Sequence, residues 1–295
     1  MTLLFMSKIH NPAVWTAALR HHLPDLEIAI WPEVGDPSAV EFALVWSPKP
    51  GELRRYPNLK AVFSFGAGVE HIFADAELPP VPVVKVVDAR LTKGLTEYVL
   101  LHVLRQHRRL DLMRRAQDQA RWIGFATPDT RNTTVGIMGL GEIGRDAAFA
   151  LVHLGFRVAG WSRTPKDVPG VEGFHGPGGL DAFLKLSRFL VCLLPLTPDT
   201  RGILNRERLA LLPRGAHLIN AGRGPLVVDE DLIAALDSGH IASATLDVFH
   251  REPLPPAHAF WSHPKVTVTP HNASDTVPDS VAAQIADNIR RAKRG

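Results

Sequence analysis

The sequence predicts an α/β fold with mainly parallel sheets. Short apolar runs that suit strands alternate with longer patterns that suit helices along nearly the whole chain, as in proteins built from βαβ units. Proline and glycine gather between these runs, where turns are needed. With 295 residues, 45% of them hydrophobic and 21% charged, the chain is long enough for one large or two medium domains with an ample core.

The first part of the chain predicts five strands and one helix that begins after Asn11-Pro12. The strands are expected at residues 2–6, 26–31, 42–46, 60–65 and 81–87. A long helical pattern begins near Thr92 and is apolar on more than one face. A helix of this kind is buried either by a domain core or by a partner subunit. We expect a domain boundary near Arg90, before this helix.

The second part continues the alternation of strands and helices. Strands are expected at residues 135–138, 157–161, 189–194, 217–220, 243–246 and 266–269. The best-marked helix covers residues 229–238, with Asp229 as its N-cap and Gly239 as its stop signal. A last, amphipathic helix is expected from about residue 277 to residue 292.

A glycine motif at Gly139, Gly141 and Gly144 follows the strand at 135–138 and opens an apolar helical pattern. Gly139 allows a tight turn, Gly141 lets the backbone approach a pyrophosphate, and Gly144 lets the helix pack closely on the strand. The helix N-terminus adds N–H donors and a partial positive charge. Glycine turns also serve ordinary folding, but the strand before and the helix after favour a dinucleotide site.

Polar residues follow three further predicted strands. Arg223 follows the strand at 217–220, Asp247 and Glu252 follow the strand at 243–246, and His271 follows the strand at 266–269. Each could have a plain structural role, such as a solvated turn residue or one of 14 ordinary histidines. The carboxyl ends of parallel strands meet at one crevice, however. These residue types suit a carbonyl reaction on an anionic substrate. An arginine binds a carboxylate, a histidine exchanges a proton near neutral pH, and an acid orients the histidine.

The composition of the chain limits which partners it can bind and in which cellular compartment it is expected. The net charge is +3, and basic residues gather between Arg105 and Arg121, as on a surface that binds nucleic acid. Asp111 and Asp118 interrupt this basic segment. We therefore expect a solvated helix face and no nucleic-acid partner. No apolar run reaches the ~18 residues of a membrane span, and the N-terminus predicts a first strand and not a signal peptide. The single cysteine, Cys192, lies in an apolar run and predicts a buried residue in a cytoplasmic protein. We expect no metal.

The five motifs together resemble those of the D-isomer-specific 2-hydroxyacid dehydrogenases. They are Gly139-Leu-Gly-Glu-Ile-Gly144, Leu194-Pro-Leu-Thr197, Asn220-Ala-Gly-Arg-Gly224, Asp247-Val-Phe-His-Arg-Glu-Pro253 and Pro270-His271. The resemblance runs nearly end to end and implies two doubly wound parallel-sheet domains. A Rossmann NAD(P)-binding domain at 91–271 would be inserted in a flavodoxin-like substrate domain at 1–90 and 272–295. An arm at about 94–122 would form a homodimer.

The resemblance also implies roles for individual residues. His271 would donate a proton to the keto oxygen, Glu252 would pair with His271, and Arg223 would bind the substrate's carboxylate and carbonyl. The segment from Phe65 to Val69 resembles the family's substrate loop, with the N–H groups of Ala67, Gly68 and Val69 on the substrate carboxylate. The residues implied to bind the cofactor are Gly139, Leu140, Gly141, Glu142, Ile143, Gly144, Ser162, Arg163, Thr164, Leu194, Pro195, Ala221, Gly222 and Asp247, of which Asp247 would face the nicotinamide amide.

Within the family the sequence is most similar to the glyoxylate/hydroxypyruvate reductases. Trp46 would place an aromatic wall over a small substrate, and Ser162-Arg163-Thr164 ends the second cofactor strand where an NAD site expects an acid. Because an arginine pairs with a 2′-phosphate, the sequence predicts NADP(H). The alternative is that Arg163 points to solvent and that NAD also serves.

The expected reaction is therefore the NADPH-dependent reduction of a small 2-keto acid, such as glyoxylate or hydroxypyruvate, to a 2-hydroxy acid. Two alternatives stay open. One is a dehydrogenase for a larger 2-hydroxy acid. The other is a nucleotide-sensing binding protein, like the co-repressors that resemble these dehydrogenases. Such proteins can retain Arg223, Glu252 and His271, so these residues do not distinguish an enzyme from a co-repressor.

Overall fold

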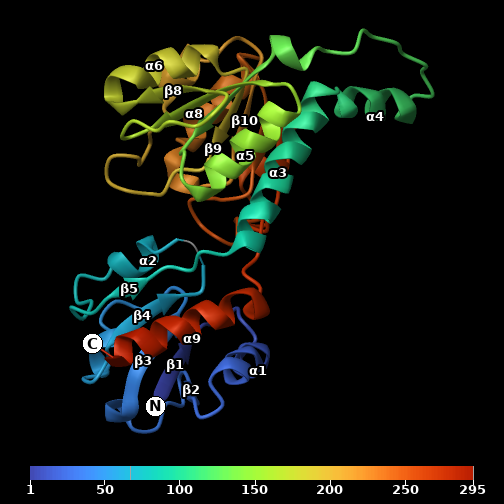
Figure 1. The fold of residues 1–295 in the computed structure, drawn as a ribbon. Coiled ribbons are helices and arrows are strands. Elements are labelled where there is room, and N and C mark those ends of the chain that lie inside the picture. Colours follow the sequence, from blue (N-terminus) through green and yellow to red (C-terminus); the bar gives the residue numbers. More distant parts are fainter. Residues whose placement is uncertain (67, 295) are drawn as a thin grey trace. The chain divides into compact units, whose positions relative to one another are not determined.

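The computed structural model describes residues 1–66 and 68–294, and the chain divides into two compact units. The first unit comprises Met1–Leu91 with Asp275–Gly295, and the second comprises Thr92–Ser274. Each unit is built around one sheet in which every pair of neighbouring strands is parallel. The predicted α/β class with parallel sheets is thereby confirmed (Figure 1).

The first unit holds a five-stranded sheet in the order β2-β1-β3-β4-β5. Its strands are β1 (Thr2–Met6), β2 (Glu27–Ile30), β3 (Val40–Val45), β4 (Ala61–Ser64) and β5 (Val83–Val84). The chain changes direction across the sheet between β1 and β3, which is the flavodoxin-like arrangement. In such a sheet, the crevice at the carboxyl ends of the two switch strands is where ligands bind.

The side chains of this sheet alternate between two apolar layers, as period-two strands require. Leu3 and Phe5 pack under the helices α1 (Pro12–His22) and α9 (Pro278–Arg294), whereas Leu4 and Met6 face the opposite layer. That opposite layer contains α2 (Glu70–Phe73) and the 3-10 helix η2 (Leu53–Arg55). The helix at the end of the chain thus packs beside the first helix, and the two segments complete one core (Figure 1).

The second unit holds a seven-stranded sheet in the order β12-β11-β10-β9-β6-β7-β8. Its strands are β6 (Thr134–Met138), β7 (Arg157–Ser162), β8 (Val171–His175), β9 (Phe189–Cys192), β10 (Ala216–Asn220), β11 (Ile241–Leu246) and β12 (Val266–Val268). The chain starts in the middle at β6, winds outward through β7 and β8, and then returns to β9 on the other side of β6. This is the Rossmann order, with its switch point between β6 and β9.

Helices cover both faces of this sheet. They are α3 (Ala89–His107), α5 (Glu142–His153), α6 (Gly176–Leu186), α7 (Arg206–Leu211) and α8 (Asp229–Asp237), whereas α4 (Leu110–Asp118) lies outside these layers. One core joins α3 and α5 to strand residues such as Ile137 and Val191, and the other joins α6, α7 and α8 to Met138 and Cys192. Cys192 is fully buried, as predicted, and burial raises the pKa of its thiol to about 12.

Three elements differ from the sequence-based expectation. β8 was not predicted because its Val-Glu-Gly-Phe-His sequence is polar and half exposed, and it becomes a strand only by pairing with β7 at the sheet edge. β5 covers only Val83–Val84 of the predicted 81–87, and Pro82 before it has no N–H group to donate, although its carbonyl accepts from the N–H of Val62 at 2.9 Å. Asp229 is the first residue of α8 and not its N-cap, and its carboxylate lies 3.4 Å from both His250 and His258.

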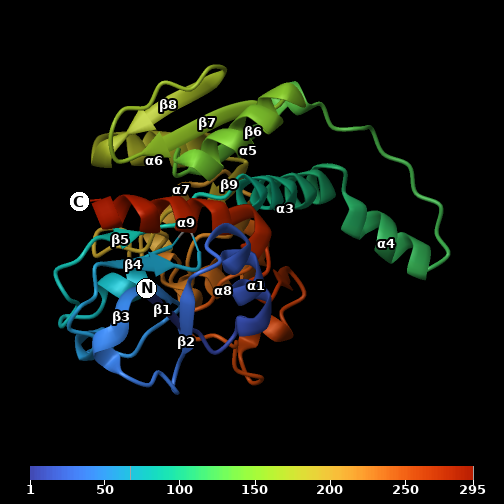
Figure 2. The ribbon, with the colours of Figure 1, turned by 60° about the horizontal axis from the view of Figure 1, so that its bottom comes forward.

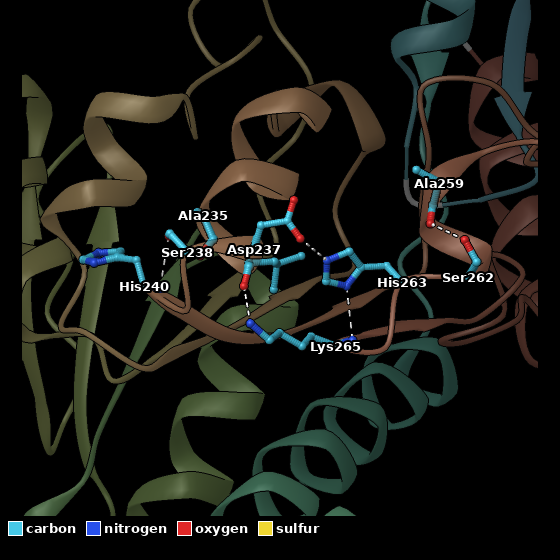
Figure 3. Close-up of polar contacts among 9 residues, drawn as sticks. Ala235, Asp237, Ser238, His240, Ala259, Ser262, His263 and Lys265 are labelled. Carbon is cyan, nitrogen blue, oxygen red and sulfur yellow. Dashed lines mark hydrogen bonds and ion pairs between the residues drawn. The ribbon is translucent and has the colours of Figure 1, made fainter.

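The C-terminal end of α8 is stabilised by residues from a later part of the chain. The helix carries three acids in its first turn but no basic residue in its last turn. Lys265 donates a hydrogen bond to the carbonyl of Leu236, and His263 lies 3.3 Å from the Asp237 carboxylate (Figure 3). A cation at this end interacts favourably with the helix dipole, so the segment before β12 is tied to α8.

The segment α4 and the residues 119–129 project away from the seven-stranded sheet in both ribbon views (Figures 1 and 2). Arg109, at a φ of 54°, breaks the helical path between α3 and α4. Several large apolar side chains on this arm are exposed, namely Leu101, Leu110, Leu112, Met113 and Trp122. α3 therefore buries Val99 and Val103 in the second unit while other apolar positions remain uncovered.

None of the helices within residues 1–66 and 68–294 combines the length and the apolar character needed to cross a bilayer.

Candidate active site

The strand ends of the second unit are held together by backbone hydrogen bonds that continue past the regular strands. The N–H groups of Ala221, Asp247 and Thr269 donate to the carbonyl of the neighbouring strand at 3.2, 3.0 and 3.0 Å. Closer to the switch point, Leu193 donates to Met138 at 2.9 Å. The segments that carry the predicted polar residues therefore follow adjacent strands at the same sheet edge.

Of the three glycines in the turn after β6, only Gly141 has open space next to its Cα, where a ligand could lie. A Cβ on Gly144 would lie 1.8 Å from the carbonyl oxygen of Gly139, so the helix α5 packs directly on the turn. A Cβ on Gly141 would meet nothing within 4 Å. Gly141 is exposed immediately before the N-terminus of α5, where the first N–H groups of a helix have no intrahelical acceptor. This cradle fits a pyrophosphate.

The residues directly after β7, from 163 to 166, include two cations and no acid, and Asp167 follows them. Arg163 and Thr164 are exposed, and so is Lys166. Ser162 is 8% exposed and its hydroxyl donates to the carbonyl of Thr164 at 2.8 Å, which shapes the turn that carries Arg163. The chemistry of this corner suits a phosphate better than a bare ribose hydroxyl.

The segments after β9 and β10 touch each other at a glycine. A Cβ on Gly222 would lie 2.8 Å from the carbonyl oxygen of Leu194. Leu194 is buried, whereas Pro195 is exposed and Ala221 is partly exposed at this edge. Asn220, which was not predicted as a site residue, fixes the turn: its side chain accepts the N–H of Gly222 at 3.2 Å and donates to the carbonyl of Arg223 at 3.0 Å.

Arg223, Glu252 and His271 come together from three different strand ends. His271 Nδ1 lies 2.7 Å from Glu252 Oε2, and the other oxygen of Glu252 accepts the N–H of Phe249 at 2.9 Å. Arg223 donates to the carbonyl of Gly222 at 2.7 Å. A Cβ on Gly224 would lie 2.0 Å from the carbonyl carbon of Phe249, so only glycine lets the Arg223 segment press against the Glu252 segment.

The electrostatics of this group favour an ionised acid beside the imidazole. Burial acts to raise the pKa of Glu252, but the hydrogen bonds from His271 and from the Phe249 N–H, with the charges of His271 and Arg223, outweigh it and lower that pKa overall. Glu252 is therefore a carboxylate at neutral pH and stabilises a protonated His271. Because Nδ1 faces Glu252, Nε2 is the ring nitrogen that can give a proton to a substrate.

Asp247 directly follows β11 and is 1% exposed. Its Oδ1 accepts from the hydroxyl of Thr269 at 2.6 Å and from the N–H of Asn272 at 3.0 Å, and its Oδ2 accepts from the N–H of Ala273 at 3.0 Å. These bonds direct the carboxylate to the 269–273 segment. The sequence reasoning missed Thr269, although a threonine directly before Pro270-His271 was a usable signal.

The residues predicted to bind substrate in the first unit lie near the carboxyl ends of its strands. Trp46 follows β3, and its ring lies 2.9 Å from where a Cβ on Gly66 would stand and 4.8 Å, between centroids, from the ring of His71. The carbonyl of Gly68 accepts from the Ser64 hydroxyl at 2.9 Å, and Val69 precedes α2. Ala67 lies outside the described residues.

Over the described part of the chain, no group of three or more His, Cys, Asp or Glu side chains is arranged to hold a metal ion.

Comparisons with known proteins agree with this geometry. The sequence profile of the D-isomer specific 2-hydroxyacid dehydrogenase NAD binding domain matches residues 100–273. A curated relative, glyoxylate/hydroxypyruvate reductase A of Serratia proteamaculans, is 41% identical over all of this chain and 96% of its own length.

Two solved structures are also similar to the whole chain. A D-isomer specific 2-hydroxyacid dehydrogenase from Xanthobacter autotrophicus Py2, in complex with NADPH and MES, is 46% identical with a TM-score of 0.95, and the match covers 100% of this chain and 95% of that one. An NADPH-dependent glyoxylate/hydroxypyruvate reductase from Sinorhizobium meliloti, in complex with NADP and sulfate, is 39% identical with a TM-score of 0.93, over 100% and 96% of the two chains.

The two helix-proximal glycines should respond differently to the same substitution. We expect Gly141→Ala to leave the melting temperature unchanged, because the added methyl meets open space, but to weaken NADPH binding about tenfold or more by blocking the pyrophosphate. Gly144→Ala should cost about 1–3 kcal/mol of stability because it overpacks the turn. Calorimetry and fluorescence titration of both variants measure these effects. A Gly141→Ala protein that binds NADPH as the wild type does would contradict the cradle.

Proposed function

The chain belongs to the D-isomer specific 2-hydroxyacid dehydrogenase family, and from this premise we propose that it reduces small 2-keto acids, such as glyoxylate and hydroxypyruvate, to 2-hydroxy acids with NADPH. The observation that carries the proposal is the His271–Glu252 pair, 2.7 Å apart, on the same sheet edge as the glycine turn. A proton donor supported by an ionised acid, on the same sheet edge as a nucleotide turn, is what reduction of a keto group by hydride transfer requires.

Each residue has a defined part in the proposed reaction. When bound, NADPH supplies the hydride that reduces the keto carbon. His271 donates a proton from Nε2 to the keto oxygen, and Glu252 stabilises the charged imidazole before the transfer. Arg223 binds the substrate carboxylate and polarises the carbonyl. A positioned acid of this kind typically supplies ~10²–10⁴ in rate. The N–H groups of Gly68 and Val69, with the predicted Ala67, are the proposed further ligands of the carboxylate.

The surroundings of Trp46 support a small substrate. The indole is packed over Gly66 and beside His71, and Phe65 is stacked at 4.1 Å on His10 behind it. Rings that are fixed on several sides cannot rotate away to admit a bulky side chain without losing these contacts. This favours glyoxylate or hydroxypyruvate over a larger 2-keto acid.

Cofactor preference follows from the end of β7. Arg163 is exposed directly after the strand, at the position where an NAD site has an acid, and the first acid beyond β7 is Asp167, next to Lys166. A charge-assisted hydrogen bond is worth about 1.5–3 kcal/mol, or roughly a ten- to hundredfold change in affinity. Relatives solved with NADPH or NADP are consistent with this preference.

The arm supports a homodimer. Leu101 is 59% exposed, Leu112 39% and Trp122 fully exposed, all on the segment that the resemblance assigns to dimerisation. A monomer rarely leaves so many large apolar side chains uncovered in one place. The one cysteine, buried and unreactive, fits the proposed cytoplasmic location.

A spectrophotometric assay tests the function and the cofactor together. With glyoxylate or hydroxypyruvate, we expect kcat/KM to be at least about tenfold higher with NADPH than with NADH. Arg163→Ala should lower the NADPH value and leave the NADH value nearly unchanged, whereas Arg157→Ala, at the opposite end of β7, should change neither. A clear preference for NADH would refute the cofactor assignment. Nucleotide binding without turnover of any 2-keto acid would favour the nucleotide-sensing alternative.

The proton donor is tested by paired variants. His271→Ala should lower kcat about 10²–10⁴-fold while the Kd for NADPH stays within a few fold, because the imidazole serves the chemical step. Exchange of the exposed His153 for alanine is the matched control and should have no effect. Unchanged turnover in His271→Ala would remove this residue from the mechanism.

The pH dependence tests the role of Glu252. The carboxylate, with its lowered pKa, is charged across the neutral range and favours the protonated imidazole. Glu252→Gln, which cannot ionise, should therefore lower kcat/KM and change its dependence on pH relative to the wild type, because the negative charge beside the proton donor is lost. Profiles of kcat/KM between about pH 5 and pH 9 measure this. Superimposable profiles would show that Glu252 does not support the donor.

The oligomeric state tests the arm. Light scattering should give twice the 32.3 kDa chain mass for the wild type. A double variant, Leu112→Lys with Trp122→Ser, should dissociate to monomers, because both apolar contacts are lost to water. Trp261→Ser removes another exposed tryptophan outside the arm and should leave the mass unchanged. A wild-type protein that elutes and scatters as a monomer would end this part of the proposal.

A further inference from the structure

A chain of hydroxyl groups joins the arm helix α3 to the catalytic edge of the sheet. Tyr98, on α3, has its hydroxyl 2.7 Å from the hydroxyl of Thr269, which in turn donates to Asp247 at 2.6 Å. We propose that Tyr98 and Thr269 are positioning residues for the reaction, which fix Asp247 so that it holds the turn that presents His271. The inference rests on the proposed function in that His271 is taken as the proton donor.

The direction of these hydrogen bonds is defined. A threonine hydroxyl has one proton, and Thr269 gives it to the carboxylate of Asp247. The bond between Tyr98 and Thr269 therefore has Tyr98 as its donor. Tyr98 is 8% exposed, and burial raises the pKa of its phenol, so the proton stays in place over the working range of the protein. The Tyr98 hydroxyl therefore donates to Thr269 and the Thr269 hydroxyl donates to Asp247, so the two hydrogen bonds run in one direction.

Asp247 connects the two sides of the His271 turn. It receives Thr269 from before the histidine and the N–H groups of Asn272 and Ala273, each at 3.0 Å, from after it. His271 itself has a φ of 52°, a left-handed conformation that residues with a Cβ rarely adopt. Such a conformation persists when its surroundings determine it. The buried carboxylate, with three donors, is the group that does so here.

Loss of either hydroxyl should loosen this turn more than it destabilises the fold. Without the Thr269 hydroxyl, Oδ1 of Asp247 keeps only the Asn272 N–H and the carboxylate can rotate. The 2.7 Å contact between His271 Nδ1 and Glu252 then depends on a turn that Asp247 no longer holds from the Thr269 side, where only backbone hydrogen bonds remain. A misplaced proton donor lowers the chemical step, because proton transfer requires hydrogen-bond distance. Substrate capture by Arg223 should be little affected.

The test compares changes at two nearby threonines, Thr267 on β12 and Thr269 directly after it. Thr269→Val removes the hydroxyl at constant shape, Thr269→Ser keeps it, and Thr267→Val makes the same change two residues earlier, where the hydroxyl accepts from Arg105 at 3.2 Å and does not touch Asp247. We expect Thr269→Val to lower kcat about tenfold or more, with KM for glyoxylate and the Kd for NADPH within about twofold. Thr269→Ser should restore most of kcat, and Thr267→Val should leave it unchanged. Tyr98→Phe should act in the same direction as Thr269→Val, but more weakly.

A second measurement does not depend on activity. Hydrogen exchange at the amides of Asn272 and Ala273 should become at least about tenfold faster in Thr269→Val and unchanged in Thr267→Val, because these N–H groups bond to Asp247. If the wild type reduces no 2-keto acid, the proposed function fails, and the exchange rates still decide whether the hydroxyls hold the turn.

Two results would overturn the inference. One is wild-type kcat and wild-type exchange in both Thr269→Val and Tyr98→Phe. The other is a loss of kcat that Thr269→Ser fails to restore, or that Thr267→Val reproduces, since either would indicate general damage to the strand and not a specific hold on the turn.

Discussion

The site depends on the close pairing of parallel strands beyond their last regular residues. The N–H groups of Ala221, Asp247 and Thr269 continue the ladder by one step each, so the chains that leave β10, β11 and β12 start side by side. A parallel sheet fixes the direction of every strand, and all carboxyl ends therefore lie along one edge. Residues separated by about fifty positions in the sequence acquire a common location in this way.

Glycines convert this shared edge into direct contact. Gly222 and Gly224 bring their backbone so close to Leu194 and Phe249 that any side chain would collide with main-chain atoms. Arg223, which lies between them, is thereby placed beside the segment that carries Glu252. The same principle acts at Gly144, where contact with Gly139 seats α5 on its turn. Backbone contacts of this type allow little adjustment, so they favour one fixed arrangement of the polar side chains.

Much of the fold and many site positions could be predicted because they depend on local pattern. Alternating apolar runs predicted most strands of both sheets, and the family resemblance selected the residues at their ends. β8 and the tertiary cap of α8 could not be predicted in this way. β8 forms a strand because it pairs with β7. The cation at the C-terminal end of α8 is Lys265, which lies 29 residues after Leu236, so the sequence of the helix itself does not indicate it (Figure 3).

The sequence by itself determined which elements form, where the glycine turn lies, and which residue types follow each strand, because periodicity and turn chemistry are local properties of the chain. Only the tertiary structure decided that His271 Nδ1 faces Glu252 and that Asp247 is enclosed by Thr269, Asn272 and Ala273. Tyr98 is the clearest example: in the sequence it is one of several polar residues of a long helix, and its hydrogen-bond partner lies 171 residues away in the chain. Hydrogen bonds between residues so far apart in the sequence result from tertiary packing, which brings together groups that no local sequence pattern relates.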